Sequence, residues 1–361
     1  MIMEKLNEKK WISISLGNQF RLCRGRESKS TVIEGGRLPF VSAKKTDNGY
    51  RMFVEQTKTE INGNTITLNN NGDGGAGFGY YQPHKYTVDV NTTALIPLPN
   101  VSMNPFIGLF YVGCFSWMHE YFGNACTLSN KRAKISKIMI PVNDLGNPDY
   151  AYMEQYVKKI RNEMITKYKE YIVKRILKIG KEVTIEALIS KEWDAFVIGN
   201  LFDVSRPFSR NKDAYDEGDI PFIASGALNN GVMKYCKPYD GEVLDKRCCI
   251  TVSPVDGSSF YQPIDFLGRG GGGSSILMLR SKNLNEFNGQ FIARMVRQTC
   301  SKYTYGHMGN KDSIKRERIM LPINDSGEPD YAYMEQYARN MMLRKYKQYL
   351  AYLDKKAEAG S

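Results

Sequence analysis

Residues 141–156 read PVNDLGNPDYAYMEQY, and residues 322–337 read PINDSGEPDYAYMEQY. Thirteen of the sixteen positions are identical, and the two copies begin 181 residues apart. Chance does not produce a match of this quality within one chain. The chain is therefore an internal duplication, and its long period excludes a solenoid, whose repeats span roughly 20–50 residues.

The duplication extends upstream of these two stretches. Trp11 and the segment LGNQF at 16–20 match Trp193 and the segment IGNLF at 198–202. Three shorter matches follow in the same order: PFV at 39–41 with PFI at 221–223, Asn-Gly at 48–49 with 230–231, and Tyr-Gln-Pro at 81–83 with 261–263. The 361 residues thus form two copies of one unit, with diverged segments between the matching ones.

Each copy has two parts. The first part is rich in β-branched and aromatic residues with Gly, Asn and Pro between them, which predicts short strands and turns. The second part follows an Asn-Asp-x-Gly-x-Pro-Asp turn, and its proline suits the first turn of a helix, where acidic side chains (Asp149, Glu154, Asp330, Glu335) are also favoured. We expect an α+β protein with mostly-β domains at 1–147 and 183–328 and long helices at 148–182 and 329–356.

The two long helices are expected to pack against each other. Apolar residues recur every three or four positions, for example at Met153, Val157, Ile160 and Met164 in the first helix. The second helix repeats the stripe at Met334, Ala338, Met341, Tyr346, Tyr349 and Leu353, after losing three residues relative to the first. An antiparallel pair would cover both stripes and hold the β domains apart by a spacer of about 45 Å, a little more than one DNA turn of about 34–36 Å.

The charge balance favours a polyanionic partner. The chain has 50 Lys and Arg against 38 Asp and Glu, a formal charge of +12. A basic surplus on a folded chain indicates binding to nucleic acid or to an anionic membrane face. Basic clusters start at Arg21 in the first copy. The candidate DNA-contacting residues are Arg24, Arg26, Lys29, Lys44, Lys45, Arg51, Lys131, Arg132, Lys134, Arg206, Arg210, Lys212, Arg269, Lys302, Tyr303, Tyr305, His307, Lys311 and Lys315.

Other features narrow the class of protein. The seven cysteines are scattered without a CxxC pair, and the three histidines lie far from any cluster of cysteines, so we expect neither structural zinc nor a disulfide framework. The N-terminus has no apolar segment typical of a signal peptide, and we expect a cytoplasmic protein. The uncharged run at 101–118 contains Asn104 and Pro105, and a buried helix is expected there rather than a membrane span.

The motifs resemble a known family. The opening W-x4-LGNxF, the PF(V/I) strand with its Asn-Gly turn, the (F/Y)YQP segment and the closing IM(I/L)P resemble the target-recognition domain of specificity subunits in type I restriction-modification systems and their type IIB-like relatives. The resemblance covers nearly the whole chain, twice. It implies that each domain reads one half of a bipartite, asymmetric double-stranded DNA site. It also implies that the helices dock methyltransferase subunits, two of them by expectation, which carry S-adenosylmethionine, and that a restriction subunit can join them.

Two other functions remain open at this point: a self-sufficient DNA methyltransferase or nuclease, and a scaffold that binds only protein. Asn-Pro-Asp-Tyr at 147–150 is close to the motif by which amino-methyltransferases hold a flipped adenine. Its copy at 328–331 begins with Glu, and both lie at helix starts, so a turn with a helix cap is the favoured interpretation. The glycine-rich stretches at 72–79 and 268–275 lack the context of a cofactor site and are expected to be loops. We therefore expect neither catalytic residues nor a bound cofactor or metal in this chain.

Overall fold

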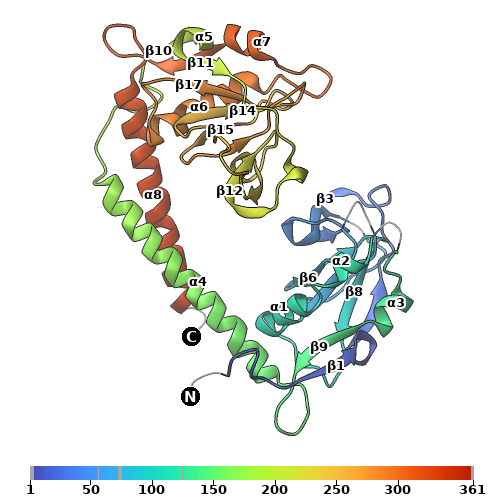
Figure 1. Ribbon diagram of the computed structural model, residues 1–361. Coiled ribbons are helices and arrows are strands. Elements are labelled where there is room, and N and C mark those ends of the chain that lie inside the picture. The colour runs from blue at the N-terminus through green and yellow to red at the C-terminus, as the bar shows by residue number, and fades with distance from the viewer. Residues whose placement is uncertain (1–3, 56, 72–74, 124–125, 359–361) are drawn as a thin grey trace. The chain divides into compact units, whose positions relative to one another are not determined.

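The protein is described here by a computed structural model covering residues 4–55, 57–71, 75–123 and 126–358 (Figure 1). The chain separates into two compact units, residues 1–168 and 169–361. The division falls inside the long helix α4 (Tyr150–Ile179), so the first unit contains the start of that helix and the second unit contains its end. Each unit is described separately.

Unit 1 is built mostly from strands. A four-stranded antiparallel sheet has the order β2-β8-β5-β6, and a three-stranded sheet has the order β4-β3-β7, with β7 parallel to β3. A separate antiparallel pair joins β1 to β9, so that Trp11 lies opposite Pro141. The strands are β1 (Trp11–Ser15), β2 (Phe20–Arg24), β3 (Glu34–Val41), β4 (Tyr50–Val54), β5 (Thr65–Asn69), β6 (Gly79–Gln82), β7 (Thr87–Val88), β8 (Thr92–Pro97) and β9 (Lys137–Pro141).

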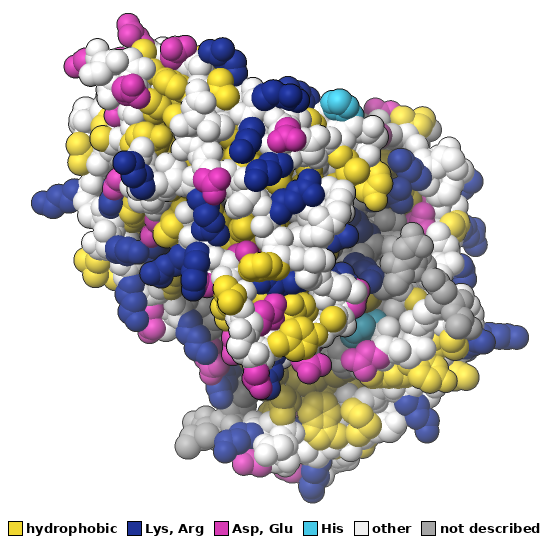
Figure 2. Space-filling view, turned by 45° about the horizontal axis from the view of Figure 1, so that its top comes forward, with side chains coloured by type: hydrophobic (Ala, Val, Ile, Leu, Met, Phe, Trp, Pro, Cys, Tyr) yellow, Lys and Arg dark blue, Asp and Glu magenta, His cyan; other side chains and the backbone are white. Residues whose placement is uncertain are grey.

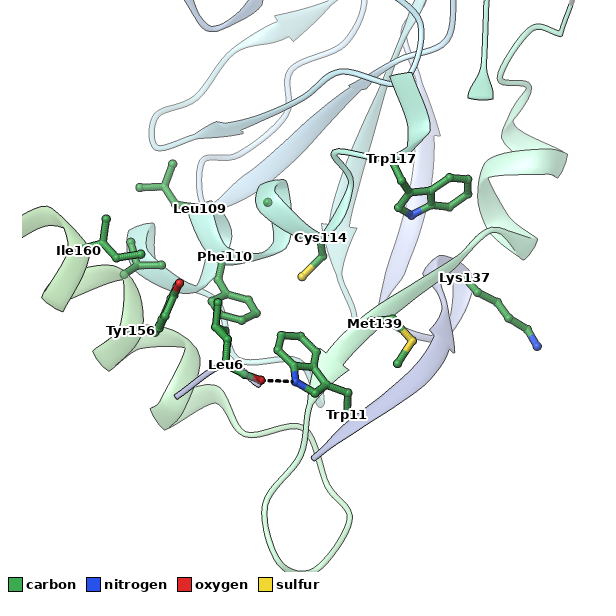
Figure 3. Close-up of a pocket in the computed structure, with 12 residues that line it drawn as sticks. Leu6, Trp11, Leu109, Phe110, Cys114, Trp117, Lys137, Met139, Tyr156 and Ile160 are labelled. Atoms are coloured by element: carbon green, nitrogen blue, oxygen red, sulfur yellow. Dashed lines mark hydrogen bonds between the residues drawn. The ribbon is translucent and has the colours of Figure 1, made fainter. Parts of the chain in front are cut away.

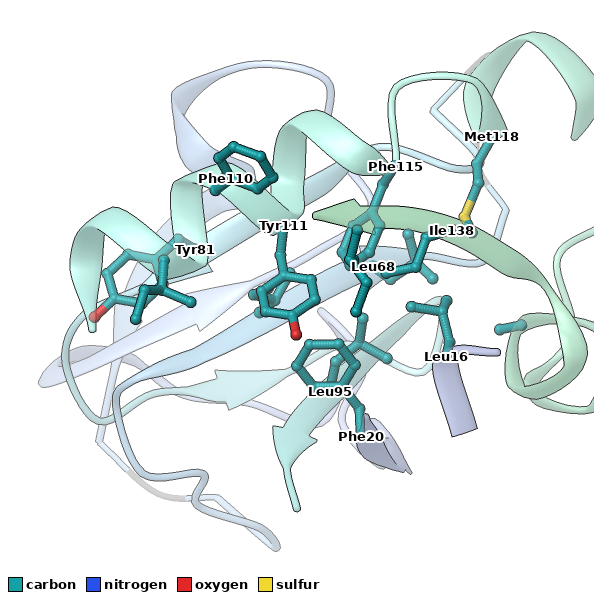
Figure 4. Packing of buried hydrophobic residues seen from close by; sticks show 14 of the residues in the cluster. Leu16, Phe20, Leu68, Tyr81, Leu95, Phe110, Tyr111, Phe115, Met118 and Ile138 are labelled. Carbon is teal, nitrogen blue, oxygen red and sulfur yellow. The ribbon is translucent and has the colours of Figure 1, made fainter. Parts of the chain in front are cut away.

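Three helices complete the first unit: α1 (Pro105–Cys114), α2 (Met118–Tyr121) and α3 (Asn130–Ile135). Helix α1 lies in the uncharged run at 101–118, where the side chain of Asn104 caps its first backbone N–H groups. Its inner face, including Tyr111 and the following Phe115, packs into the main core beside the four-stranded sheet (Figure 4). The expected buried helix is thus present, although Leu109 on its outer face is half exposed.

Unit 2 repeats this topology strand for strand. Its sheets have the orders β11-β17-β14-β15 and β13-β12-β16, and β10 pairs with β18 as β1 pairs with β9. Its elements are β10 (Trp193–Val197), α5 (Ile198–Leu201), β11 (Asp203–Ser205), β12 (Glu217–Ile223), β13 (Val232–Cys236), β14 (Cys249–Val252), β15 (Ser259–Gln262), β16 (Leu267–Gly268), β17 (Leu277–Arg280), α6 (Glu286–Cys300), α7 (Lys311–Arg316), β18 (Arg318–Pro322) and α8 (Tyr331–Glu358). The predicted α+β fold with two mostly-β domains and long helices is confirmed.

The retained Asn-Gly and Tyr-Gln-Pro segments meet in one hydrogen-bonded cluster. The Gln82 amide donates to the Asn48 carbonyl at 3.0 Å and to the Thr67 hydroxyl at 3.1 Å. In unit 2, Gln262 makes the same bonds at 3.1 and 2.8 Å. Asn48 and Asn230 have φ near +56°, a conformation that asparagine tolerates. Because a buried amide without partners is costly, these matches preserve the fold.

The sixteen-residue repeat fixes how each long helix leaves its domain. The Asp149 carboxylate accepts from the Tyr152 backbone N–H at 3.0 Å, and Asp330 accepts from Tyr333 at 2.9 Å. Lys9 and Lys191 pair with these aspartates at 2.8 and 3.0 Å. The side chains of the preceding turn also match, because Asn143 and Asn324 each accept two backbone N–H bonds. The turn-and-cap interpretation of the Pro-Asp-Tyr segment is confirmed.

Within unit 2, the end of α4 runs antiparallel to α8. Lys169 pairs with Asp354 at 2.6 Å, and ten residues later the Ile179 carbonyl accepts from Arg339. Ile179, Ala338 and Leu343 are buried together. The predicted stripe was partly wrong. Leu343, which was left out of it, is 1% exposed, whereas Met341 is 36% exposed.

The glycine-rich stretches lie in loops where they are described, except that Gly79 begins β6 and Gly268 ends β16. Residues 72–74 lie outside the described residues, and residues 75–78 form a turn before β6. Residues 269–275 connect β16 to β17. Among the described residues, no helix combines the length and the apolar character needed to cross a bilayer.

Candidate nucleic-acid interface

The basic candidates of unit 1 lie on or beside strands and on α3. Arg21 and Arg24 are on β2, Arg51 is on β4, and Lys44 and Lys45 precede the Asn-Gly turn. Arg24 donates from Nε to the Val90 carbonyl at 2.8 Å. Lys44 pairs with Asp47, and its hydrogen bond to that carboxylate lowers the pKa of Asp47. Arg26 and Lys29 follow β2, and both are exposed.

Helix α3 brings its cations next to β2. Lys131, Lys134 and Arg21 line one pocket of about 480 Å³, together with the apolar side chains of Phe20, Leu22 and Leu98. Arg132 lies on the same helix but turns away, because its guanidinium donates to the Thr127 carbonyl at 2.7 Å. The structure thus gathers two predicted DNA contacts and Arg21 into one site.

In unit 2 the candidates have more protein partners. The Arg206 guanidinium donates to the Gly271 carbonyl at 3.4 Å, and Lys212 pairs with Asp213. Lys302 pairs with Glu317 at 2.7 Å. Tyr305 is 79% exposed, and Lys311 and Lys315 lie on α7. The remaining exposed candidates are Arg269, in the glycine-rich loop after β16, and His307. Figure 2 shows lysine and arginine side chains spread over much of one face of the molecule.

Two predicted DNA contacts are buried instead. The Arg210 side chain is 2% exposed and donates to Glu242 at 2.8 Å and to Asp245 at 2.6 Å. Burial opposes its charge, but the bonds to these carboxylates outweigh that effect and raise the pKa of Arg210. Tyr303 is 3% exposed, and its hydroxyl donates to Glu317 at 2.6 Å. Both side chains hold protein segments together and are not available to DNA.

Strands β4 and β13 carry exposed apolar and aromatic side chains that were not among the candidates, because the candidates were chosen mainly for positive charge. Strands β4 and β13 show the same alternation of exposed and covered residues. The exposed positions carry Arg51 and Phe53 in unit 1, and Met233 and Tyr235 in unit 2. The two-residue alternation of a strand is the signal that could have found them. Matched positions therefore present different chemistry on the same scaffold.

An apolar groove of about 560 Å³ lies beside the start of α4 in unit 1 (Figure 3). Trp11 stacks on Phe110 with ring centroids 6.1 Å apart, and the Trp11 indole donates to the Leu6 carbonyl at 3.0 Å. Tyr156 and Ile160 of α4 form one wall. Unit 2 retains the aromatic stack, because Trp193 lies 6.1 Å from Phe291.

The acidic, histidine and cysteine side chains show neither a metal cluster nor a disulfide in the described part of the chain. In the described part of the chain, no group of three or more His, Cys, Asp or Glu side chains is arranged to hold a metal ion. All seven cysteines are free thiols.

The chain matches one protein family twice. The family is described as the type I restriction modification DNA specificity domain, and it matches residues 8–172 and again residues 190–349. The chain belongs to this family. It is a specificity subunit of a restriction-modification system, with two target-recognition domains, and the two matches correspond to the two copies of the fold.

Three individual proteins are similar to this chain. The specificity subunit S.BcgI of a type II restriction enzyme from Heyndrickxia coagulans is 25% identical over 309 residues, covering 84% of this chain and 85% of the relative. Two solved structures are also similar. The type I S subunit from M. genitalium has a TM-score of 0.49 at 14% identity, covering 99% of this chain and 97% of that one. The HsdS subunit from Thermoanaerobacter tengcongensis has a TM-score of 0.32 at 12% identity, covering 96% and 91%.

Proposed function

We propose that this specificity subunit reads a bipartite, asymmetric DNA site, with one half-site for each target-recognition domain. One observation carries the proposal. The two domains share strand order and buried hydrogen bonds, yet the exposed positions of β4 and β13 differ, with Arg51 and Phe53 against Met233 and Tyr235. Arginine can bond guanine edges, whereas apolar side chains contact the thymine methyl group. Two domains of the same fold with different exposed residues can therefore recognise two different short DNA sequences.

The exposed basic residues supply the sequence-independent part of the proposed binding. Lysine and arginine neutralise phosphates and position the protein on the duplex, while base contacts give specificity. The proposed interface keeps the exposed candidates, Arg26 among them, and excludes the buried Arg210 and Tyr303. Arg24 and Arg206 stay in it, although each also donates to a backbone carbonyl of its own domain.

The long helices and the groove beside α4 would dock the methyltransferase subunits. Met164 on α4 is 66% exposed, and Ile160, 37% exposed, also lines the apolar groove. Apolar surface of this kind marks a protein partner more often than a DNA contact. In the proposed complex, two methyltransferase subunits bind S-adenosylmethionine and flip the target adenine, and a restriction subunit joins when the complex cleaves.

The chain itself is proposed to be non-catalytic and to act in the cytoplasm as the DNA-reading part of the complex. The Asn-Pro-Asp-Tyr segment supports this, because Asp149 is engaged by Lys9 and by the Tyr152 N–H as a helix cap. Its counterpart Asp330 has the same partners in unit 2. Because the segment caps a long helix in both copies, it gives no specific support for a self-sufficient methyltransferase.

Mapping of DNA methylation in cells with and without this chain tests the proposal. We expect methylation to disappear from one motif only, consisting of two unlike short blocks with unspecified bases between them. Restoring the wild-type chain should restore the pattern. Methylation that stays unchanged without the chain, or a lost motif that is a single uninterrupted block, would rule the proposal out.

A further inference from the structure

The pocket between β2 and α3 in the first target-recognition domain is lined by three cations and no carboxylate. Arg21 comes from β2, and Lys131 and Lys134 come from successive turns of α3. The other lining residues are Gly17, Phe20, Leu22, Leu98 and Asn130. Within the ranges that the structure describes, none of the three cations forms an ion pair with a carboxylate. Their charge is therefore available to a ligand.

The backbone holds Lys134 in place over this pocket. A Cβ atom at Gly17 would lie 2.5 Å from the Lys134 Cγ atom and 3.0 Å from its carbonyl oxygen. The absence of a side chain at position 17 lets α3 approach the turn before β2 this closely. Strand β2 is itself paired along its whole length with β8, which places Arg21 opposite Ile96. The three cations are thus carried by elements that are fixed relative to one another.

The second domain keeps the scaffold of this pocket but loses its excess of positive charge. Gly199, Phe202 and Lys315 occupy the positions of Gly17, Phe20 and Lys134, and a Cβ at Gly199 would again lie 3.0 Å from the lysine carbonyl. The positions of Arg21 and Lys131, however, hold Asp203 and Asp312. Lys311 takes the position of Asn130, so two aspartates and two lysines in the second domain stand where the first domain has three cations and no carboxylate.

We infer that the pocket formed by Arg21, Lys131 and Lys134 binds a backbone phosphate of the DNA, and that the second domain has no equivalent contact. This inference rests on the proposed function and extends it. A guanidinium and two ammonium groups around one cavity suit a phosphate, because arginine matches its oxygens in a forked geometry and lysine adds charge. The first domain then contributes more of the salt-dependent affinity than the second.

The salt dependence of DNA binding by the full-length chain tests the inference. Binding to a labelled mixed-sequence duplex is measured by fluorescence anisotropy between about 50 and 200 mM salt, where each phosphate contact contributes about 0.9 to the slope of log K against log salt. The double variant Arg21→Gln/Lys131→Gln removes this one phosphate contact and should reduce the magnitude of the slope by about 0.9. The charge-preserving variant Arg21→Lys/Lys131→Arg should keep the wild-type slope.

A matched control removes the same charge elsewhere in the first domain. The variant Lys5→Gln/Lys10→Gln changes exposed side chains outside the pocket, and it should leave the slope unchanged. Thermal unfolding should show that all variants are folded, because the substituted side chains are exposed. An equal fall in slope for this control and for the pocket variant would mean that only net charge matters, and would overturn the inference.

Two further outcomes separate the inference from the proposed function. Salt-dependent binding by the wild type with an unchanged slope in the pocket variant would refute the phosphate site alone. A wild-type chain that does not bind duplex DNA even at low salt would refute both. Calorimetry with inorganic phosphate distinguishes the source of the ligand. If free phosphate binds the wild type but not the pocket variant, and both have the same DNA slope, the pocket binds a small anion. That result would overturn the DNA contact.

Discussion

At the scale of single residues, the parts of the sequence that repeat are the parts that the fold needs. Asp149 and Asp330 each cap a long helix and each pair with a lysine from the segment before the first strand. Burial opposes the ionisation of Asp149, but the hydrogen bonds from Lys9 and from the Tyr152 N–H outweigh it and lower its pKa. A carboxylate with a lowered pKa stabilises the folded state whenever it is ionised.

Replacing this cap should cost stability in a pH-dependent way. We expect Asp149→Ala to lower the free energy of unfolding by about 1–2 kcal/mol at neutral pH, through loss of the cap and the Lys9 pair. Because the folded pKa is lowered, the stabilisation is present above the unfolded value of about 3.9 and is lost as the pH falls through the folded pKa. Urea unfolding of the full chain at pH 7 and at about pH 3, below the unfolded value, measures the difference.

The exposed Asp144 in the adjacent turn provides the control. Its replacement by alanine should change the free energy of unfolding by less than about 0.5 kcal/mol. An Asp149→Ala effect no larger than that of Asp144→Ala, or one that grows as the pH falls, would contradict the assigned role of the cap.

The sequence predicts the role of a single residue where its hydrogen-bond partners lie near it in the chain. The caps were predictable because Asp149 bonds a backbone group three residues away. Arg210 was not, because its partners Glu242 and Asp245 lie more than thirty residues further on and only folding brings them together. The sequence shows that a residue is basic, but it does not show whether the folded chain buries that residue in an ion pair with a carboxylate.

At the scale of elements, the end of α4 and helix α8 hold the second unit together. Leu343 packs with Ile179 and Phe287, and Glu286 accepts from Arg175 at 2.5 Å and from Lys178 at 3.1 Å. Burial again opposes ionisation, but these two cations lower the pKa of Glu286. The periodic stripe predicted a packed helix. It missed Leu343 because the segment after α4 also packs on α8, where Asn340 bonds both backbone groups of Val183.

Removing the central side chain of this contact should destabilise unit 2. Leu343 is 1% exposed, so Leu343→Ala should lower the free energy of unfolding by about 2–5 kcal/mol through lost burial and a new cavity. Met164→Ala is the matched control, because Met164 is a long apolar residue of α4 that is 66% exposed, and it should cost less than about 0.5 kcal/mol. Calorimetric unfolding measures both. Equal losses would show that the helix contact does not support the unit.

At the scale of the whole molecule, the duplication explains both the likeness and the difference of the two target-recognition domains. The sequence matches predicted the repeated topology, because they mark the same buried bonds in both copies, such as Gln82 to Thr67 and Gln262 to Thr251. The Asn-Gly match at 48–49 and 230–231 aligns Phe53 with Tyr235 in the sequence. Which of the residues after that turn point outward follows from the strand alternation that the structure shows.

We propose that one chain carries two target-recognition domains that read different DNA sequences. This proposal is tested most directly by selecting binding sites for the purified full-length chain from a library of random duplexes and sequencing the retained fraction. We expect two unlike conserved blocks at a constant separation. Substitution of Met233 and Tyr235 by alanine should reduce the sequence preference in one block and leave the other block unchanged. A single conserved block, two identical blocks, or no enrichment over the starting library would contradict it.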